Sequence, residues 1–534
     1  MNSSPPSIFN DVLGPVMRGP SSSHSAAANR IGRLARDLAG GSIRQVVIRY
    51  DPNGSLVTTH KDQGTDLGLY SGLLGWTPDD PRIPGYAAAL AESGIEIDLR
   101  YESYDAPHPN FYRLELTGTD GHDYRLDAVS TGGGMIELRA IDGIELRSAG
   151  DFYHTLGWFD AEPEADFQAA FQTFAEGVSW HASAAGAGGL LNIYSREPLA
   201  PAQLEALRQH AACRQVRGLQ AVLPVLSQRE LNVSFQRAGE MLQQGQLVDQ
   251  PLGYCALRYE CERSGFSEAA LDGMMDELVT IIETAINTGL AGTDYADRVL
   301  PAQSPGFQRA EEAGKLVPAD INNRIIRYVS AIMEVKSSLG VIVAAPTAGS
   351  CGAMPGAVLA VAHAMGKDRS EIRQALFAAG LIGVFIARDA TFAAEEGGCM
   401  AETGSGASMA AAAIVQMAGG TQTQQLAAAS MALQNSFGLV CDPVANRVEA
   451  PCLGKNITAA NNALSSANMA LAGYDPLIPM DEVVVSMNEV AHQMPREHRC
   501  TNTGGLAITP TSKKIAERLQ SGSSSSCGSR MCAC

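Results

Sequence analysis

Helices built largely from alanine and other small residues are the feature that most constrains the fold of this chain. Helical spacing with alanine dominating recurs in the second half, at 357–365, 372–387, 408–417 and 424–433, and 268–285 repeats apolar positions every three and four residues. Small side chains let neighbouring helices approach closely. With 54 glycines and only 6% aromatic residues, residues 226–515 are predicted to form a compact, mostly helical domain with functional Gly-rich connections.

The first half has a different pattern, typical of an α/β region. Residues 45–50, 111–116 and 124–129 are predicted strands in a domain spanning 1–150, and the run Thr131–Gly134 is expected to end this region as a flexible or tightly turned loop. A small α/β insert is expected over 155–225, with strands near 188–194 and 219–226 and a helix near 201–213. The predicted fold class is therefore α+β, in two or three domains over 534 residues.

Charge and cysteine usage exclude several classes of function. The net charge of −18 argues against a nucleic-acid partner, because phosphate binding needs clustered Lys and Arg. No signal peptide is visible, and the apolar run at 374–387, about fourteen residues, is shorter than the roughly 20 that a membrane helix needs. Eleven cysteines, an odd number, suit buried, catalytic or metal-binding thiols in the cytoplasm better than disulfides. We expect a cytoplasmic protein without a membrane partner.

Three cysteines stand in unusual surroundings. Cys399 follows Glu396-Gly397-Gly398, Cys441 opens Cys441-Asp442-Pro443-Val444, and Cys452 lies between Pro451 and Gly454. At such turns a thiolate can project from a loop or a helix end. Three thiolates can hold a cubane iron–sulfur cluster and leave one iron open to a substrate. Three protein ligands and an open position equally describe catalytic zinc, so both interpretations stay open.

Two polar loops and two histidines complete the candidate residues. Gly19-Pro20-Ser21-Ser22-Ser23-His24-Ser25 precedes a helix expected from Ala26, and Ala345 to Gly352 lies between an apolar run and a helix. Either loop could cradle a carboxylate or phosphate, or could be an ordinary cap or turn. His24 and His60 stand beside polar loops and are candidate bases, although a lone histidine is more often structural.

Taken together, these segments resemble the iron–sulfur-dependent L-serine dehydratases, or L-serine ammonia-lyases, in the single-chain form whose β region precedes the α region. The resemblance covers most of the chain in the right order. It is carried by Gly19–His24, Ala345–Gly352, Glu396–Cys399, Cys441–Val444, Pro451–Cys452 and Asn502–Ala507.

The resemblance implies an amino-acid-degrading lyase. Cys399, Cys441 and Cys452 would bind a [4Fe–4S] cluster, no pyridoxal phosphate is expected, and β-elimination at the open iron would convert L-serine to a 2-keto acid, pyruvate, and ammonia. The residues implied to bind the small amino-acid substrate are Ser21, Ser22, Ser23, Thr65, Thr347, Gly349 and Ser350. A homodimer is expected. In the tail, 516–534, Cys534 would plug the open iron, with Cys532 as a weaker substitute.

Two departures from the family pattern keep alternatives open. Gln63 stands where the family usually has a histidine in Gly-His-Gly-Thr-Asp, and glutamine cannot take a proton at neutral pH, so His60 or His24 must supply the base or the reaction differs. The insert at 155–225 could be regulatory or could shape a pocket for a larger substrate. The alternatives are a cysteine desulfidase, a lyase acting on a larger β-substituted amino acid, and a non-enzymatic redox sensor.

Overall fold

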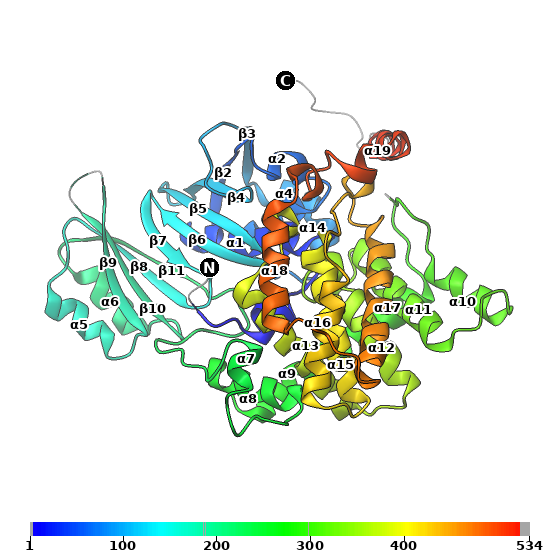
Figure 1. Cartoon of the computed structure of the whole chain (residues 1–534). Coiled ribbons are helices and arrows are strands. Elements are labelled where there is room, and N and C mark those ends of the chain that lie inside the picture. Colours follow the sequence, from blue (N-terminus) through cyan, green and yellow to red (C-terminus); the bar gives the residue numbers. More distant parts are fainter. Residues whose placement is uncertain (1–3, 185, 187, 297, 524–534) are drawn as a thin grey trace. The chain divides into compact units, whose positions relative to one another are not determined.

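The computed structural model describes residues 4–184, 186, 188–296 and 298–523, and it divides the chain into two compact units (Figure 1). The first unit consists of residues 1–18, 22–236 and 257–271, and the second of residues 19–21, 237–256 and 272–534. Helices and sheets are both present, as the predicted α+β class requires.

A six-stranded sheet forms the centre of the first unit. In spatial order its strands are β3 (Glu96–Tyr101), β2 (Ile43–Tyr50), β4 (Phe111–Gly118), β5 (Asp123–Gly132), β6 (Met135–Ile141) and β7 (Ile144–Ser148). Only β2 and β3 pair in parallel, and they are joined through α2 (Leu56–Thr59), α3 (Thr65–Leu73), η3 (Ile83–Gly85) and α4 (Tyr86–Ser93). The three predicted strands are confirmed.

The glycines at 132–134 do not end this domain. They form the turn between β5 and β6, and all three have positive φ, which glycine adopts without a side-chain clash. The tight turn confirms one of the two forms expected for this run, and the sheet continues through β6 and β7 to Ser148.

One face of this sheet is covered by two helices that approach each other very closely. Apolar side chains of α1 (Ala27–Leu38) and α3 join those of β2, β4, β5 and β6 in one core. At the crossing, a Cβ on Gly72 would lie 2.2 Å from the carbonyl oxygen of Asn29, and one on Gly68 would lie 2.0 Å from that of Ser25. Glycine is therefore required where these backbones meet. The chain enters through η1 (Ile8–Val12), β1 (Val16–Met17) and η2 (Ser22–Ala26).

Residues 153–219 form a second, four-stranded antiparallel sheet with two helices. In chain order the elements are β8 (Tyr153–Phe159), α5 (Ala165–Gln172), β9 (Gly177–Ala182), β10 (Gly189–Ser195), α6 (Pro201–Gln209) and β11 (Cys213–Leu219), and the strand order is β11-β8-β10-β9. This βαββαβ order is a ferredoxin-like arrangement. The strand expected at 219–226 is absent, because β11 ends at Leu219 and the apolar side chains that follow are buried in irregular chain.

The second sheet shares its core with the first. Helices α5 and α6 cover one face, with Phe171, Leu207 and their neighbours packed together (Figure 1). From the strands, Leu156, Trp158 and Leu190 enter the same core as α1 and the six-stranded sheet. Residues 153–219 are therefore built into the first unit rather than attached to it.

Almost all of the remaining chain is helical. Its helices are α7 (Ala238–Met241), α8 (Leu252–Ser264), α9 (Glu268–Ala291), α10 (Ser304–Glu312), α11 (Asp320–Ser337), η4 (Ala348–Ser350), α12 (Ala353–Ala364), α13 (Arg369–Asp389), α14 (Ala394–Cys399), η5 (Met400–Gly404), α15 (Ser405–Met417), α16 (Gln422–Gln434), η6 (Val444–Asn446), α17 (Cys452–Leu471), α18 (Met480–Gln493), η7 (Arg496–His498), η8 (Gly505–Ile508) and α19 (Pro510–Ser523), with one short strand, β12 (Ile342–Val343). The predicted Ala-rich helices are all present.

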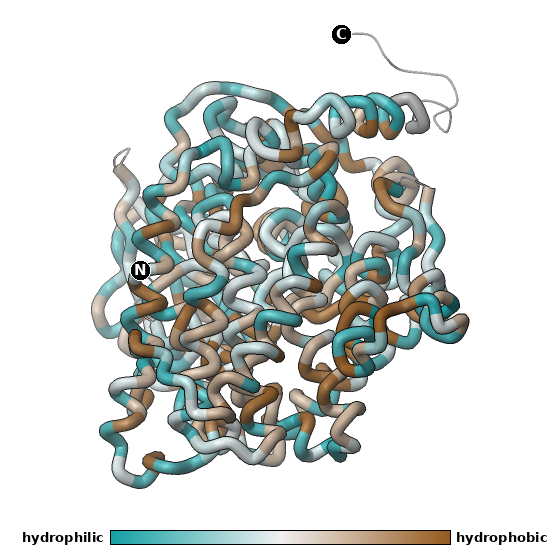
Figure 2. Tube along the Cα trace, turned by 45° about the vertical axis from the view of Figure 1, so that its right-hand side comes forward, coloured by the Kyte–Doolittle hydropathy of each residue, from teal (hydrophilic) through white to brown (hydrophobic). Residues whose placement is uncertain are grey.

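Helix α15 is the centre of the second unit. It contacts α12, α13, α16 and α17, and its residues are buried on every side except at Gln416. A helix that is apolar all round is buried in this way. Figure 2 shows brown, white and teal stretches alternating along the trace of the chain.

Helix α13 is, among the described residues, the one helix long and apolar enough to cross a membrane by length and composition. Thirteen of its side chains, from Ile372 to Ile386, are buried within the protein, and it packs against α15. The core helix expected at 372–387 is confirmed.

We predict that Gly72→Ala lowers stability although alanine is the better helix former. The added Cβ must displace the backbone of α1, and overpacking of this kind costs about 1–3 kcal/mol. The matched control is Gly273→Ala in α9, where nothing lies within 4 Å of the new Cβ, so stability should rise by about 0.5–1 kcal/mol. Chemical denaturation measures both, and an unchanged midpoint for Gly72→Ala would contradict the close crossing.

Candidate functional site

The two predicted histidines lie close together in the first unit. The His24 ring is buried, with Nε2 3.0 Å from Thr59 Oγ1 and Nδ1 3.1 Å from Ser23 Oγ. The next residue after Thr59 is His60, whose Nδ1 lies 2.8 Å from Asp66 Oδ1 and whose Nε2 lies 2.7 Å from the Tyr101 hydroxyl. A carboxylate on one ring nitrogen orients an imidazole and fixes its tautomer.

The other predicted polar residues of the first unit lie in the segments that carry these histidines. Ser22, Ser23 and Gln63 are buried, and the Ser25 hydroxyl donates to the Gln63 carbonyl. Thr65 begins α3, and its buried hydroxyl makes no hydrogen bond with the described residues. The roles of His24 and His60 as bases stay predictions.

The three predicted thiols come from three different elements of the second unit. Cys399 ends α14, Cys441 follows α16 and pairs by an isolated bridge with Arg499, and Cys452 begins α17. All three are buried. Gly398 has φ +64°, and a Cβ there would lie 2.8 Å from the Leu439 carbonyl oxygen, so the turn that delivers Cys399 requires glycine.

A fourth buried thiol, Cys500, lies with them. Cys399, Cys441 and Cys500 pack in one cluster, and contacts to the other two thiols, followed by burial, raise the pKa of Cys441 well above its usual range. Burial first, and then the charge of Cys399, raises the pKa of Cys452. The sequence offered one signal for Cys500, its position just before the Gly504-Gly505-Leu506-Ala507 segment, and that signal was missed.

Lys455 joins the thiol-bearing segments to one another. It lies on the first turn of α17, and its Nζ donates to Asp442 Oδ1 at 2.6 Å and to the Val440 carbonyl, and lies 3.7 Å from Cys399 Sγ. Burial lowers the pKa of Lys455, but the charges of Cys399 and Asp442 outweigh it and raise the pKa to about 12. The other carboxylate oxygen of Asp442 accepts from the Leu506 amide at 2.9 Å. The site therefore contains a fixed positive charge beside its thiols.

The predicted loop at 345–352 forms a tight polar turn in the same unit. Thr347 caps η4: its Oγ1 accepts from the Ser350 amide at 3.2 Å. Asn456, one turn beyond Cys452 on α17, donates to the Gly349 carbonyl at 2.8 Å and accepts from the Ala353 amide at 2.9 Å. The helix that carries Cys452 therefore also holds this turn in place.

Glu402 is a second residue that the sequence interpretation left without a role. It lies in η5, three residues after Cys399, and its Oε1 accepts from Thr347 Oγ1 at 2.6 Å. Burial raises the pKa of Glu402 to about 7; the Thr347 hydrogen bond acts in the opposite direction, and the charge of Glu395 adds to the rise. A carboxyl group that titrates near neutral pH is suited to proton transfer.

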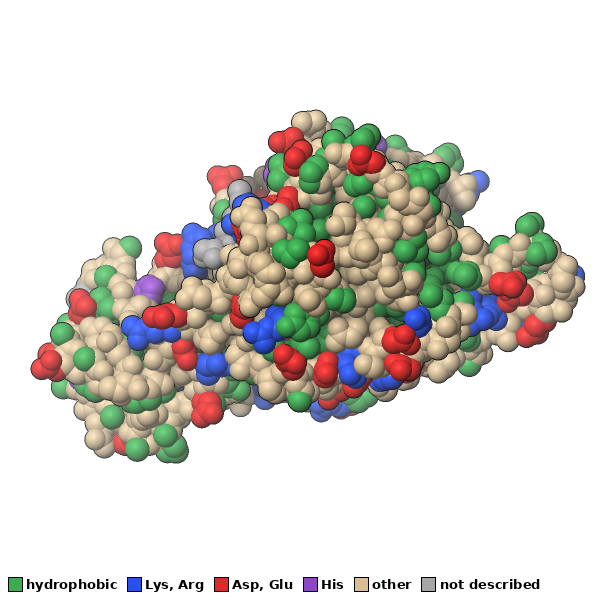
Figure 3. Space-filling model, turned by 60° about the horizontal axis from the view of Figure 1, so that its bottom comes forward, with side chains coloured by type: hydrophobic (Ala, Val, Ile, Leu, Met, Phe, Trp, Pro, Cys, Tyr) green, Lys and Arg blue, Asp and Glu red, His purple; other side chains and the backbone are tan. Residues whose placement is uncertain are grey.

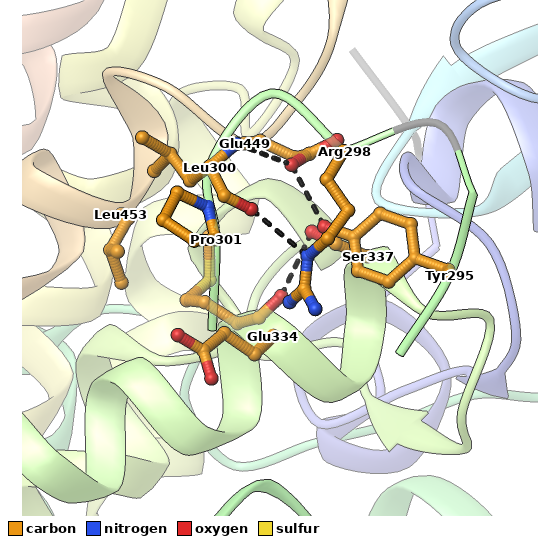
Figure 4. A pocket seen from close by; sticks show the side chains of 9 residues that line it. Tyr295, Arg298, Leu300, Pro301, Glu334, Ser337, Glu449 and Leu453 are labelled. Carbon is orange, nitrogen blue, oxygen red and sulfur yellow. Dashed lines mark hydrogen bonds between the residues drawn. The ribbon is translucent and has the colours of Figure 1, made fainter. Parts of the chain in front are cut away.

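A small pocket is lined by residues that include Arg298, Glu334 and Leu453, the residue after Cys452 (Figure 4). Glu449 closes it, accepting from the Tyr295 hydroxyl at 2.8 Å and from the Val299 amide at 3.1 Å. These contacts tie the 293–301 connection to the segment before α17. Burial raises the pKa of Glu334, whose Oε1 accepts from the Ser304 amide at 3.2 Å.

Two predicted features have no counterpart among the described residues. Cys532 and Cys534 lie outside the described part of the chain, so the plug stays a prediction. Within residues 4–523, apart from 185, 187 and 297, no group of three His, Cys, Asp or Glu side chains is gathered tightly enough for a single metal ion.

Comparison with known proteins adds an independent finding. Residues 203–507 match the family profile described as "Serine dehydratase alpha chain". The chain is 39% identical over 248 residues to the probable L-serine dehydratase alpha chain of Bacillus subtilis, covering 46% of this chain and 83% of the relative. It is 38% identical over 260 residues to the L-serine dehydratase alpha chain of Peptoniphilus asaccharolyticus, covering 48% and 89%. L-serine dehydratase 1 of Escherichia coli is 26% identical over 508 residues, covering 92% and 96%.

We predict that Lys455→Met strongly destabilises the second unit. The substitution leaves the Asp442 carboxylate buried without its cation, which costs about 3–5 kcal/mol. In Asp442→Asn/Lys455→Met no buried charge remains, so part of that loss should be recovered. Urea denaturation of anaerobically purified protein measures both.

The control is Lys513→Met, because Lys513 is exposed on α19. Its denaturation midpoint should match the wild type. If the double variant were as unstable as the sum of its single variants, Lys455 and Asp442 would act independently and the described ion pair would not hold the site.

Proposed function

Because the chain belongs to the serine dehydratase alpha chain family, we propose that it is an iron–sulfur-dependent lyase that deaminates L-serine to pyruvate and ammonia. The observation that carries the proposal is the set of buried thiols in the same unit as the polar turn at Thr347–Ser350. Cys452 begins α17, and Asn456 of the same helix donates to the Gly349 carbonyl of that turn. A thiol cluster gives a place for a metal group, and the turn gives a place for a small polar substrate.

The donor set fits a [4Fe–4S] cluster chemically. Soft thiolates are the ligands that such clusters use, and Cys399, Cys441 and Cys452 are buried and interact with one another. When bound, the cluster would supply a Lewis acid that makes the hydroxyl group a better leaving group. The raised pKa values of Cys441 and Cys452 mean that binding must displace their protons, so loading should depend on pH.

The chain's own residues would bind and orient the amino acid. Thr347 and Ser350 would offer hydroxyl groups to the α-carboxylate. Asn456 holds the Thr347–Ser350 turn against α17, so the bound substrate would keep a fixed distance from Cys452. Lys455 would offset part of the negative charge that three thiolates bring to a buried site.

We predict that Cys399→Ala, Cys441→Ala and Cys452→Ala each lose the visible absorbance and most of the iron and sulfide of anaerobically purified protein. Each removes one of the three thiolates that would hold the cluster. Iron, zinc and sulfide analysis measures the outcome. Stoichiometric zinc without sulfide in the wild type would reject the cluster and favour the zinc interpretation of the same thiols.

Two further cysteine variants sharpen that test. Cys255→Ala is the matched control, because Cys255 is a buried thiol of α8 whose pKa burial raises to about 11, and it should keep full iron. Cys500→Ala should also keep its iron, because three thiolates suffice to hold a cubane with one open iron. Iron loss in Cys500→Ala would move Cys500 into the ligand set.

The activity itself is tested by measuring 2-keto acid release from L-serine, L-threonine and L-cysteine separately. We expect pyruvate from serine in proportion to iron content. Faster release from cysteine, with sulfide, would favour a desulfidase, and no turnover of any of the three by iron-loaded protein would favour a larger substrate or a sensor.

The proposed setting is the cytoplasm, with a small amino acid rather than a nucleic acid as the partner. On the face shown in Figure 3, acidic and basic side chains are interspersed and neither sign forms an extended patch. A net charge of −18 also supports this part of the proposal.

A further inference from the structure

One carboxyl group lies directly against the polar turn of the second unit. Glu402 Oε1 accepts from Thr347 Oγ1 at 2.6 Å, and Thr347 in turn caps the Ser350 amide. The Glu402 residue as a whole is partly buried, and its carboxyl group faces the Thr347 side chain. It is therefore positioned to contact a molecule bound at the turn.

The turn is shaped to admit this carboxyl group. A Cβ on Gly349 would lie 2.7 Å from Glu402 Oε1 and 2.8 Å from Oε2, so any side chain at position 349 would displace the Glu402 carboxyl group from this position. Gly349 has no positive φ that would otherwise require glycine. The glycine thus serves the close approach of Glu402, a role distinct from flexibility.

The surroundings of Glu402 hold its pKa near neutrality. Burial and the charge of Glu395 raise it, whereas the Thr347 hydrogen bond and the charges of Lys336 and Lys455 lower it, and the result is about 7. Such a group is ionised in a large fraction of molecules at neutral pH and can still hold a proton after taking one. Glu402 can therefore take up a proton near neutral pH, which Gln63 cannot do.

We propose that Glu402 is the catalytic base that removes the Cα proton of the amino acid bound at the Thr347–Ser350 turn. The inference rests on the proposed function. The Cα–H bond breaks and its proton passes to a Glu402 carboxylate oxygen, while the electron pair forms the Cα–Cβ double bond. The Cβ–O bond breaks with its electron pair on oxygen. The hydroxide then takes the proton back from Glu402 and leaves as water, so one amino acid gives one enamine and one water, and Glu402 returns to its ionised form.

A purely binding role for Glu402 makes a different prediction. A carboxylate could instead hold the substrate's ammonium group, and its loss would then weaken serine binding more than it slowed the reaction. The two roles are separated by measuring serine affinity and Cα-proton exchange in addition to turnover.

The test is Glu402→Gln in anaerobically prepared, iron-loaded enzyme. Glutamine has the same size and can still accept from Thr347, but it cannot take a proton. We expect kcat to fall by about 10²–10⁴-fold, with iron content, visible spectrum and the calorimetric affinity for L-serine within about threefold of the wild type. Exchange of the serine Cα proton in D₂O should be lost. Glu402→Asp should recover part of both rates.

Glu395→Gln is the matched control, because Glu395 is the neighbouring carboxylate on α14 whose charge reaches Glu402. Its kcat should stay within about threefold of the wild type. The assignment is overturned if Glu402→Gln keeps more than a tenth of kcat, if it loses serine affinity but retains Cα-proton exchange, or if Glu395→Gln is equally impaired. If the iron-loaded wild-type enzyme did not act on serine, the proposed function itself would be contradicted, and not only the assignment of Glu402.

Discussion

The contacts of one lysine hold the candidate site together. Lys455 reaches Asp442, Val440 and Cys399 from the first turn of the helix that begins at Cys452. Cys399 and Cys452, the outer two of the three predicted ligands, are more than 50 positions apart in the sequence. The Lys455 ammonium group lies near Cys399, bonds to the residues on either side of Cys441, and belongs to the helix that Cys452 begins. A buried cation of this kind is stable only while its partners stay in place. The geometry of the thiols therefore depends on the contacts of Lys455.

The helical part of the fold could be predicted because its pattern is local. Alanine-dominated segments with helical spacing gave α12, α13, α15 and α16 to within a few residues. The strands of the first unit were equally readable where apolar residues alternate, as in β4. Prediction failed where a local sequence has two structural meanings: the apolar residues after Leu219 suggested a strand but are buried without pairing.

The candidate site could be predicted only in part, for a related reason. Cys399, Cys441 and Cys452 stand beside glycine or proline and carry a family resemblance, so they were visible in the sequence. Cys500 and Glu402 become candidates only through contacts with residues distant in the chain. Cys500 lies beside Cys441, and Glu402 lies beside Thr347 and Gly349. Nothing in the sequence around Glu402 indicates that a glycine 53 positions earlier leaves room for its carboxyl group.

The shared core of the two sheets has a consequence for how this protein could be altered. Leu156, Trp158 and Leu190 belong to residues 153–219 but complete the interior of the six-stranded sheet. Excising residues 153–219 would not yield a smaller enzyme, because the apolar side chains of α1 and of the six-stranded sheet that share this core would be exposed to water. The ferredoxin-like segment therefore cannot be exchanged or removed by itself. A variant without it would need polar substitutions along α1 and on the sheet face that its removal exposes.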